Sequence, residues 1–325
     1  MLLYISRCCF RNVRSTTFHL KEIQKSVLRM SSSLMTTSSC NPIAAVCQVT
    51  STADKNVNFS LCQELVQQAQ KEGACMVFLP EAFDYIGTNR EETLQLSETL
   101  EGDTIQRYSQ MTRDLGIWVS LGGFHERGHT WETDRRIYNS HVIINSEGSI
   151  MAVYRKCHLF DVELPEKKVS LRESAFTIPG PKILEPLQSP IGKLGLAICY
   201  DVRFPELSLA LMRQGAEILT YPSAFTVATG TAHWEVLLRA RAIETQTFVI
   251  AAAQVGRHNS SRTSYGHSLI VDPWGDIIGR CGGDKPGYAL AEIDLNKLRR
   301  VRTDMPVQKH RRENELYLND WKQHL

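Results

Sequence analysis

The sequence lacks the patterns that mark several large classes of protein. Beyond the N-terminal arm there is no run of 18 apolar residues, so we expect no segment there to span a membrane. No Cys-x-x-Cys pair occurs, and no spacing of cysteine and histidine resembles a zinc site. Walker, Rossmann and Gly-x-Ser-x-Gly motifs are also missing. We therefore expect neither a nucleotide enzyme nor a serine hydrolase, and no metal or other cofactor.

Excess charge of one sign is missing from most of the chain, but the first 40 residues differ. Six basic side chains and one acidic one give that arm a charge of +5, so the total of +2 leaves −3 for the remainder. Because residues 41–325 carry a net charge close to zero, they do not predict a nucleic-acid partner. The arm is rich in Ser and Thr and poor in acids, as mitochondrial presequences are, although a disordered tail is the alternative. Met30 and Met35 offer alternative starts. We expect mitochondrial and cytoplasmic forms.

The cysteines do not form a recognisable framework. There are nine of them, an odd number scattered along the chain. In a protein of a reducing compartment, such scattered cysteines are expected to be free thiols. A free cysteine is most often a buried core residue, so any reactive one needs further support.

From Pro42 onward, strand and helix patterns alternate without a linker or repeat, and hairpins interrupt the alternation. This mixture predicts an α/β fold of mixed sheets covered by helices, in one domain over 41–325 behind the arm 1–40. The expected strands are 43–49, 74–79, 117–123, 193–199, 217–222, 247–254 and 288–295. The expected hairpins are 137–156 and 267–280, and the expected helices begin near Asp54, 101, Pro205 and 233.

Three reactive side chains share one placement. Glu81, Lys156 and Cys199 each stand at the C-terminal end of an apolar segment that is typical of a buried strand. In α/β sheets, this edge is where ligand crevices form. The joint placement of an acid, an amine and a thiol is more informative than any one of them.

The chemistry of the three groups is complementary. A thiol needs a base or a nearby cation to become a good nucleophile. Glu81 can take the proton of Cys199, and Lys156 can stabilise the thiolate and then an oxyanion. The backbone N–H of Tyr200 is a second oxyanion donor. We expect burial to raise the pKa of Glu81 toward neutrality.

Other interpretations of these residues stay open. The usual partner of a catalytic thiol is histidine, and His233 or His267 can approach Cys199 in space. A Cys-His hydrolase is therefore an alternative. A non-catalytic adaptor that retains the fold is another. Taken singly, a Glu or a Lys after a strand is usually a solvated loop residue.

The segments FLPEAF, YRKCHLFD and GLAICYDVRFPE resemble the three signature segments of the nitrilase, or carbon-nitrogen hydrolase, superfamily. The supporting segments RESAFTIPG, YPSAF and YGHSLIVDPWG are also similar, so the likeness spans almost all of 43–317. The resemblance implies a four-layer αββα sandwich without a metal. It implies that Glu81 is the general base, Lys156 the oxyanion stabiliser and Cys199 the nucleophile. It also implies that Glu173 orients the lysine.

The resemblance extends to substrate and assembly. CYDVRFPE and YPSAF are most similar to the omega-amidase-like branch, and within it to amidases that convert deaminated glutathione into 2-oxoglutarate and cysteinylglycine. An omega-amidase or a carbamoylase with the same triad is the alternative.

An acidic substrate requires a cation, and Arg203 is the candidate unless it pairs with Asp201 or Glu206. Tyr85, Tyr200, Ser223 and Phe225 are the further substrate-binding candidates. The likeness implies a homo-oligomer that packs through 205–215 and the tail, no membrane, and a functional link to a fragile-histidine-triad protein.

Overall fold

A computed structural model describes residues 41–164, 169–312 and 316 of the chain. The arm 1–40, with the alternative starts Met30 and Met35, lies outside the described residues, as does most of the tail after Arg312. The body that begins at Asn41 forms one unit by its internal contacts. The targeting role of the arm stays a prediction.

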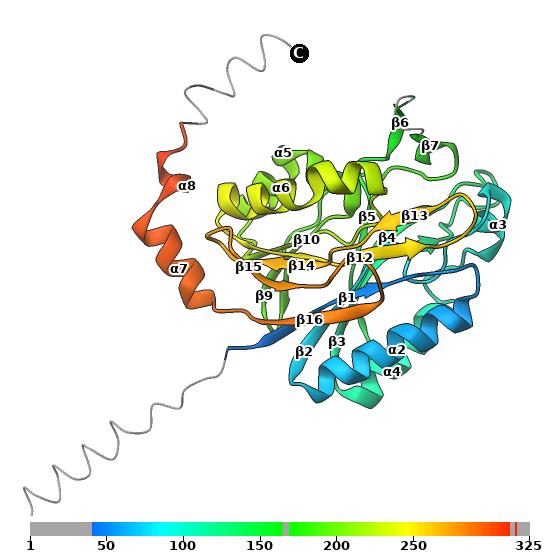
Figure 1. Cartoon of the computed structure of the whole chain (residues 1–325), viewed down its shortest axis with the longest axis horizontal. Coiled ribbons are helices and arrows are strands. Elements are labelled where there is room, and N and C mark those ends of the chain that lie inside the picture. Colours follow the sequence, from blue (N-terminus) through cyan, green and yellow to red (C-terminus); the bar gives the residue numbers. More distant parts are fainter. Residues whose placement is uncertain (1–40, 165–168, 313–315, 317–325) are drawn as a thin grey trace, which may run out of the picture. The chain divides into compact units, whose positions relative to one another are not determined.

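Two mixed sheets form the centre of the body (Figure 1). The eight-stranded sheet has the order β13-β12-β1-β2-β3-β4-β5, with β16 also paired to β1. Its strands are β1 (Ile43–Val49), β2 (Ala74–Leu79), β3 (Trp118–Glu126), β4 (Tyr138–Ile144), β5 (Ile150–Arg155), β12 (Ala253–Arg257), β13 (Thr263–Tyr265) and β16 (Gly287–Glu292). The six-stranded sheet contains, in spatial order, β15 (Ile277–Arg280), β14 (Leu269–Val271), β11 (Phe248–Ala251), β10 (Ile218–Thr220), β9 (Gly192–Leu196) and β8 (Leu187–Ser189).

The remaining elements are helices and one small hairpin. The hairpin pairs β6 (Asp161–Leu164) with β7 (Val169–Arg172). The α-helices are α2 (Lys55–Lys71), α3 (Arg90–Leu96), α4 (Asp103–Leu115), α5 (Pro205–Arg213), α6 (Val227–Thr245), α7 (Leu295–Asp304) and α8 (Val307–His310). Two short 3₁₀ turns, η2 (Glu173–Ala175) and η3 (Cys199–Arg203), carry residues of the predicted site.

The buried side chains divide the body into four layers, as Figure 1 also shows. One apolar cluster packs α2 and α4 against the outer face of the eight-stranded sheet. A second fills the space between the two sheets, with Val46 and Phe78 facing Leu196 and Ile250. A third packs α5 and α6 against the outer face of the six-stranded sheet. The αββα sandwich predicted from the sequence is confirmed.

Local sequence signals explain several element boundaries. The carboxylate of Asp54 accepts the backbone N–H groups of Asn56 and Val57, which caps α2 as its position predicted. Gly116 ends α4 in the left-handed conformation, with φ of 61°, where a residue without a Cβ is favoured. Val57 in the first turn of α2 is exposed, whereas Asn58 and Cys62 turn inward.

One predicted strand proves to be two. The apolar run over 247–254 forms β11 in the six-stranded sheet and then β12 in the eight-stranded sheet. Ala252, which lies between the two strands, is buried in the layer between the sheets. A continuous apolar run cannot reveal this change, because both sheets bury both faces of these strands.

The strand before the predicted nucleophile is shorter than expected. β9 ends at Leu196, and Cys199 begins the turn η3 instead of closing the strand. The next helix, α5, begins at Pro205 as predicted, because proline fits the first helical position. After Met305 the chain continues into α8, where Gln308 donates to the backbone oxygen of Glu244 at the end of α6.

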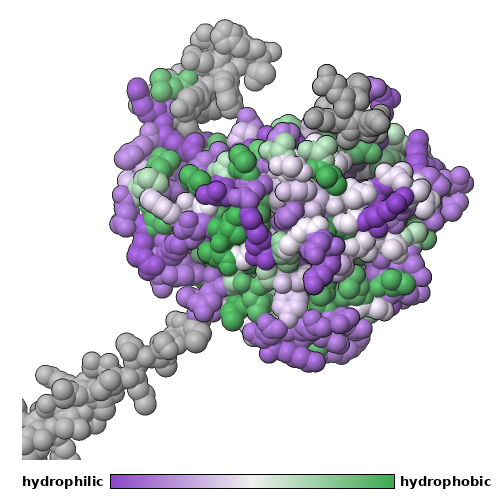
Figure 2. All heavy atoms as spheres, in the orientation of Figure 1, coloured by the Kyte–Doolittle hydropathy of each residue, from purple (hydrophilic) through white to green (hydrophobic). Residues whose placement is uncertain are grey.

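The surface of the body is mostly polar. Figure 2 shows hydrophilic residues over most of one face, with hydrophobic residues in small groups among them. No helix among the described residues combines the length and the apolar character that a membrane crossing requires. The six cysteines from Cys47 to Cys281 in the described part of the chain are all free.

Candidate active site

Glu81 stands directly beyond β2 in a strained turn. The next residue, Ala82, has φ of 57°, which is unusual for a residue that carries a Cβ. The side-chain amide of Gln254 donates to the backbone oxygens of both Glu81 and Ala82, at 3.0 Å each, and so holds the turn. Glu81 is only 6% exposed. Strain of this kind is typical of functional sites, where the surroundings fix a single geometry.

Cys199 has an equally unusual backbone. Its φ of 46° reverses the chain direction between β9 and η3, and its N–H donates to the oxygen of Pro222 at 2.9 Å. The side chain is partly exposed, whereas Ala197 and Ile198 before it are fully buried. Cys199 therefore lies at the edge of the core, packed against the apolar clusters on both faces of the six-stranded sheet. The turn also places the N–H of Tyr200 in the first turn of η3, where helical N–H groups have no partner within the helix.

Lys156 connects the two acids of the predicted site. Its Nζ lies 3.0 Å from Oε1 of Glu81, 3.0 Å from Oε1 of Glu173 and 2.9 Å from Oε2 of Glu173. The lysine is 2% exposed, so this buried cation is compensated by two carboxylates. Glu173 also accepts the backbone N–H of Phe160 at 2.7 Å, which fixes its position.

The protonation states follow from these contacts. Burial alone raises the pKa of Glu81, but the charge of Lys156 and hydrogen bonds from Cys199, Lys156 and Asn139 outweigh it and lower that pKa. Our expectation of a pKa near neutrality was therefore wrong for the resting site. Burial and then the charge of Glu81 raise the pKa of the Cys199 thiol far above its ordinary value. The resting pair is a carboxylate that faces a neutral thiol.

The lysine keeps its charge despite its burial. Burial lowers the pKa of Lys156, but the charges of Glu173 and then Glu81 outweigh burial and raise that pKa well above its ordinary value. An ammonium group in a water-poor site interacts strongly with a developing oxyanion. The arrangement therefore combines a base, a nucleophile and an electrophilic cation.

Sequence reasoning missed two groups that contact the catalytic acid. The side-chain amide of Asn139, from β4, donates to Oε1 of Glu81 at 2.9 Å and to Oε1 of Glu173 at 3.2 Å. The backbone N–H of Ala224 donates to Oε2 of Glu81 at 2.8 Å. Asn139 gave no distinct signal, because it is one of three consecutive polar residues, 139–141, at the start of this strand. Ala224 contributes only its backbone, which a side-chain pattern cannot reveal.

Asp201 was also missed as an organising residue. It is fully buried, and its carboxylate accepts the N–H of Ile198 at 2.9 Å, the hydroxyl of Tyr154 at 2.8 Å and the N–H of His158 at 3.1 Å. The Nδ1 atom of His158 lies 2.7 Å from the same carboxylate, and its ring stacks on Phe204. Asp201 therefore ties the turn at Cys199 to the chain that follows Lys156.

Three of the predicted substrate-binding residues form an aromatic and cationic group. The guanidinium of Arg203 lies 5.8 Å from the ring centre of Tyr200 and 5.5 Å from that of Phe225. Its two terminal nitrogens lie 3.3 Å from Nδ1 of His233. The alternative ion pair with Asp201 is not formed, because that carboxylate is occupied as described above. Arg203 is partly exposed and remains suited to an anionic ligand.

Two other predicted substrate-binding residues lie in the interior of the body. Tyr85 and Ser223 are both fully buried. The hydroxyl of Tyr85 donates to the backbone oxygen of Thr93 at 2.6 Å, and that of Ser223 donates to the oxygen of Tyr221 at 2.9 Å. The hydroxyl proton of each side chain is therefore used on a backbone oxygen. Their polar groups satisfy the backbone of neighbouring loops.

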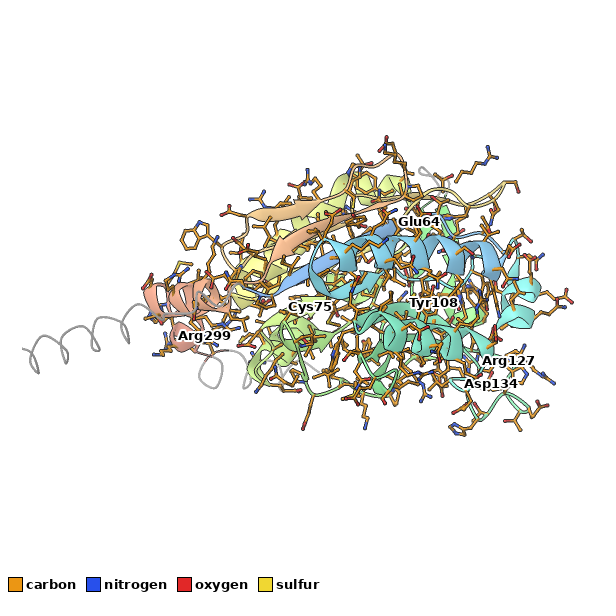
Figure 3. All side chains as sticks on the ribbon, turned by 90° about the horizontal axis from the view of Figure 1, so that it is seen from below. Glu64, Cys75, Tyr108, Arg127, Asp134 and Arg299 are labelled. Carbon is orange, nitrogen blue, oxygen red and sulfur yellow. The ribbon has the colours of Figure 1, made fainter. Side chains whose placement is uncertain are left out.

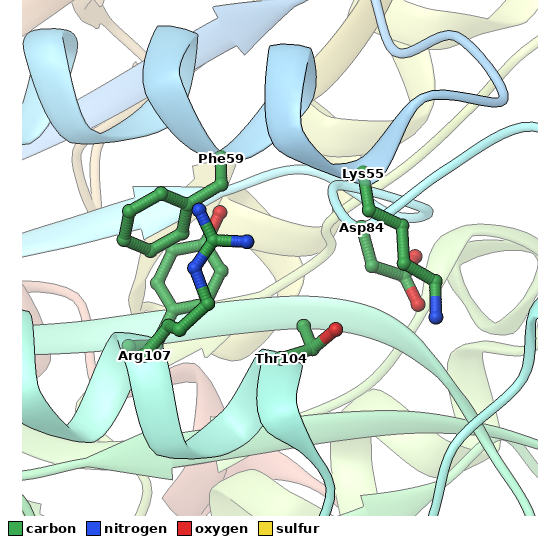
Figure 4. Close-up of a pocket in the computed structure, with 6 residues that line it drawn as sticks. Lys55, Phe59, Asp84, Thr104 and Arg107 are labelled. Carbon is green, nitrogen blue, oxygen red and sulfur yellow. The ribbon is translucent and has the colours of Figure 1, made fainter.

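A small recess lies apart from the catalytic groups, between α2 and α4. Figure 4 shows Lys55 and Phe59 from α2 opposite Thr104 and Arg107 from α4, with Asp84 between them. Tyr108, which belongs to α4 and is labelled in Figure 3, also lines this recess and packs against Phe59. Lys55 pairs with Glu98 at 2.5 Å. The recess therefore holds residues that stabilise helix packing.

The alternative histidine partners do not replace Glu81. His233 contacts Arg203 and is exposed, and the ring of His267 lies against Tyr265. The group that faces the Cys199 thiol is Glu81. Within the described residues, no group of three His, Cys, Asp or Glu side chains is arranged to hold a metal.

Comparisons with known proteins agree with this geometry. The carbon-nitrogen hydrolase family profile matches residues 43–303. Deaminated glutathione amidase of Bos taurus is 60% identical over 278 residues, which are 86% of this chain and 84% of that protein. The nitrilase and fragile histidine triad fusion protein of Caenorhabditis elegans is 46% identical over 283 residues, and the match spans only 62% of its length. The crystal structure of the C. elegans NitFhit protein superposes with a TM-score of 0.80, at 46% identity, over 85% of this chain and 66% of that one. This chain belongs to the carbon-nitrogen hydrolase family.

Proposed function

We propose that this protein is an amidase that hydrolyses the amide bond of deaminated glutathione through a thioester on Cys199. The observation that carries the proposal is the convergence of Glu81, Lys156 and Cys199 at one site. The identity of 60% to the bovine amidase, over most of both chains, supports the substrate. The products are 2-oxoglutarate and cysteinylglycine.

The first half of the reaction forms the thioester. The sulfur of Cys199 attacks the amide carbonyl carbon while its proton passes to Glu81. The carbonyl oxygen becomes an oxyanion, which the ammonium of Lys156 and the N–H of Tyr200 stabilise. Glu81 then gives its proton to the amide nitrogen, the carbon–nitrogen bond breaks, and cysteinylglycine leaves as an amine.

The second half returns the enzyme to its resting state. A water molecule attacks the thioester carbonyl while Glu81 accepts one of its protons. The carbon–sulfur bond breaks, and the proton on Glu81 returns to the sulfur. One water is consumed, one acid is released, and both catalytic groups regain their starting protonation. Glu173 keeps the Lys156 ammonium in place throughout, because it binds Nζ with both oxygens.

Arg203 is the proposed anchor for a carboxylate of the substrate. A guanidinium held over aromatic rings keeps its charge and its donors available for planar anions. His233 is its contact in the free enzyme, and a carboxylate is a stronger partner than an imidazole nitrogen. This contact favours substrates with an acidic acyl part over simple apolar amides.

The direct test is hydrolysis by the purified full-length chain. Deaminated glutathione should yield 2-oxoglutarate, whereas Cys199→Ala should yield none above background. An omega-amidase substrate and an N-carbamoyl amino acid serve as the comparison amides. Faster turnover of either comparison amide would assign the alternative specificity. An inert wild-type protein whose Cys199 does not react with thiol probes would instead favour the non-catalytic adaptor.

We also propose mitochondrial and cytoplasmic forms, homo-oligomers, and a functional link to a fragile-histidine-triad protein. The basic, acid-poor arm supports the first proposal. The family resemblance noted from the sequence supports the second. The fusion of the two proteins in the C. elegans relative supports the third. Imaging of tagged chains that start at Met1 or Met35, and co-purification from cells, would test these proposals.

A further inference from the structure

Asn139 occupies a position between the two acids that the proposed reaction does not yet explain. Its Nδ2 atom and the Nζ atom of Lys156 each donate to the same two acceptors, Oε1 of Glu81 and Oε1 of Glu173. The four atoms form a closed ring of two donors and two acceptors. Both protons of the Asn139 amide are therefore used on carboxylates.

The orientation of this amide is set by charge. If its oxygen and nitrogen exchanged places, the oxygen would face two carboxylates. In the observed orientation, Oδ1 is buried and has no hydrogen-bond partner among the described residues. A Cβ at Gly123, where φ is 71°, would lie 2.9 Å from this oxygen and 2.7 Å from Cγ of Glu81. The site therefore leaves one acceptor unpaired while both donors of Asn139 reach the acids.

The two oxygens of Glu81 consequently differ. Oε1 accepts Nζ of Lys156 at 3.0 Å and Nδ2 of Asn139 at 2.9 Å, which occupies both of its lone pairs. Oε2 accepts the N–H of Ala224 at 2.8 Å, and so retains one lone pair that can accept the hydrogen bond from the Cys199 thiol. The segment that carries this N–H runs beside Cys199, whose own N–H donates to the oxygen of Pro222 at 2.9 Å. The free lone pair is therefore on the oxygen held by the segment 222–224, which also contacts the backbone of Cys199.

We infer that Asn139 is a positioning residue that selects the oxygen of Glu81 used for proton transfer. It fills Oε1, so that the thiol proton goes to Oε2, from which it can pass to the leaving nitrogen. The inference rests on the proposed role of Glu81 as base, but it does not depend on which amide is the substrate.

Loss of the amide donor should misdirect the proton. With Oε1 unfilled, a proton on that oxygen can bridge to Oε1 of Glu173, away from the sulfur. The hydrogen bond from Asn139 also helps to lower the pKa of Glu81, so its loss should raise that pKa. The other groups that face Glu81, namely Lys156, Cys199 and the N–H of Ala224, would remain in place.

The experiment compares Asn139→Leu with wild type and with Asn58→Leu as a matched control. Asn58 is a buried amide that donates to the backbone oxygens of Thr52 and Asp84, so its loss should lower the melting temperature only. Two readouts are measured across pH: amide hydrolysis, and alkylation of Cys199 by iodoacetamide, which needs no known substrate.

For Asn139→Leu we expect kcat to fall roughly 10- to 100-fold with little change in KM, as for loss of a hydrogen bond to a charged group. The acid limb of both pH profiles should move up by about one unit. Unmoved acid limbs would overturn the inference. If Asn139→Leu does not fold, Asn139→Ala, which removes the amide without adding a charge, replaces it with the same expected shift and the same contrary result. A shifted alkylation profile in a protein that hydrolyses no deaminated glutathione would support the inference and reject only the proposed substrate.

Discussion

Lys156 and Glu81 are 75 residues apart in the chain, yet Nζ of the lysine lies 3.0 Å from Oε1 of the glutamate. Both side chains are almost completely buried. The contact joins the ends of β2 and β5, two strands of the eight-stranded sheet that are separated by β3 and β4. The sheet order, and not any local motif, therefore brings together the residues of the proposed catalytic centre.

Replacement of this lysine should impair chemistry more than binding. In Lys156→Met the oxyanion loses its cation, and we expect kcat to fall at least ~10²–10³-fold, as for other oxyanion donors. Two buried carboxylates would also remain without their cation, so thermal stability should fall as well. Lys55→Met, which breaks the ion pair with Glu98 on the far side of the eight-stranded sheet, is the control. Equal kcat values in the two variants would contradict the assigned role.

The dependence of rate on pH should show a wide plateau. Glu81 must be ionised to accept the thiol proton, and its lowered pKa keeps it ionised well into the acid range. The raised pKa values of Cys199 and Lys156 mean that neither group titrates near neutrality. We expect kcat/KM to be flat from about pH 5 to about pH 9. A steep loss of kcat/KM between pH 7 and 6, in protein shown to remain folded, would disagree with these protonation states.

Arg203 should determine the preference for acidic substrates. Arg203→Ala removes the donors for a carboxylate, so KM for deaminated glutathione should rise by roughly tenfold or more while kcat changes little. For a neutral amide of similar size, KM should stay nearly the same. His233→Ala, which removes only the resting contact of Arg203, is the control. An equal rise of KM for both substrates in Arg203→Ala would show that the arginine maintains the shape of the site and does not bind the substrate carboxylate.

Two buried histidines should make the fold sensitive to acid. His141 is fully buried, with Nδ1 3.2 Å from the oxygen of Ala197 and Nε2 2.6 Å from the hydroxyl of Ser120. Burial lowers the pKa of His141 to about 4, from 6.5, and does the same for His258. Because the unfolded chain binds these protons first, the free energy of unfolding should fall as pH drops from 6.5 to 4. Each histidine contributes up to about 3 kcal/mol to this fall.

The measurement is chemical denaturation at several pH values between 7 and 4. In His141→Gln, the decline of the unfolding free energy over this range should be shallower than in wild type. The glutamine retains hydrogen-bonding capacity but cannot take up the proton. Parallel declines in the two proteins would show that His141 does not control acid stability.

Much of the architecture could be predicted from local patterns. The cap at Asp54, the glycine after α4 and the proline at the start of α5 each fix a helix end by their own chemistry. The apolar strands and the hairpin over 137–156 were also visible. In contrast, the change of sheet at Ala252 depends on tertiary packing, which a uniformly apolar run does not encode.

The site was predictable where it depends on reactive side chains and not where it depends on geometry. Glu81, Lys156 and Cys199 stood out because each interrupts an apolar pattern at a strand end. Asn139 and Ala224 act through single hydrogen bonds that only the folded sheet brings together. The pKa of Glu81 was misjudged because burial was considered without the lysine and amide that accompany it.

The central claim is that Cys199 carries the acyl group during amide hydrolysis. The most direct test is mass spectrometry of the full-length protein, quenched with acid shortly after mixing with deaminated glutathione. The peptide that contains Cys199 should gain the mass of the acyl part of the substrate, and Cys199→Ala should show neither the adduct nor turnover. Steady hydrolysis by Cys199→Ala, or an adduct on any other residue of a fully active enzyme, would contradict the account.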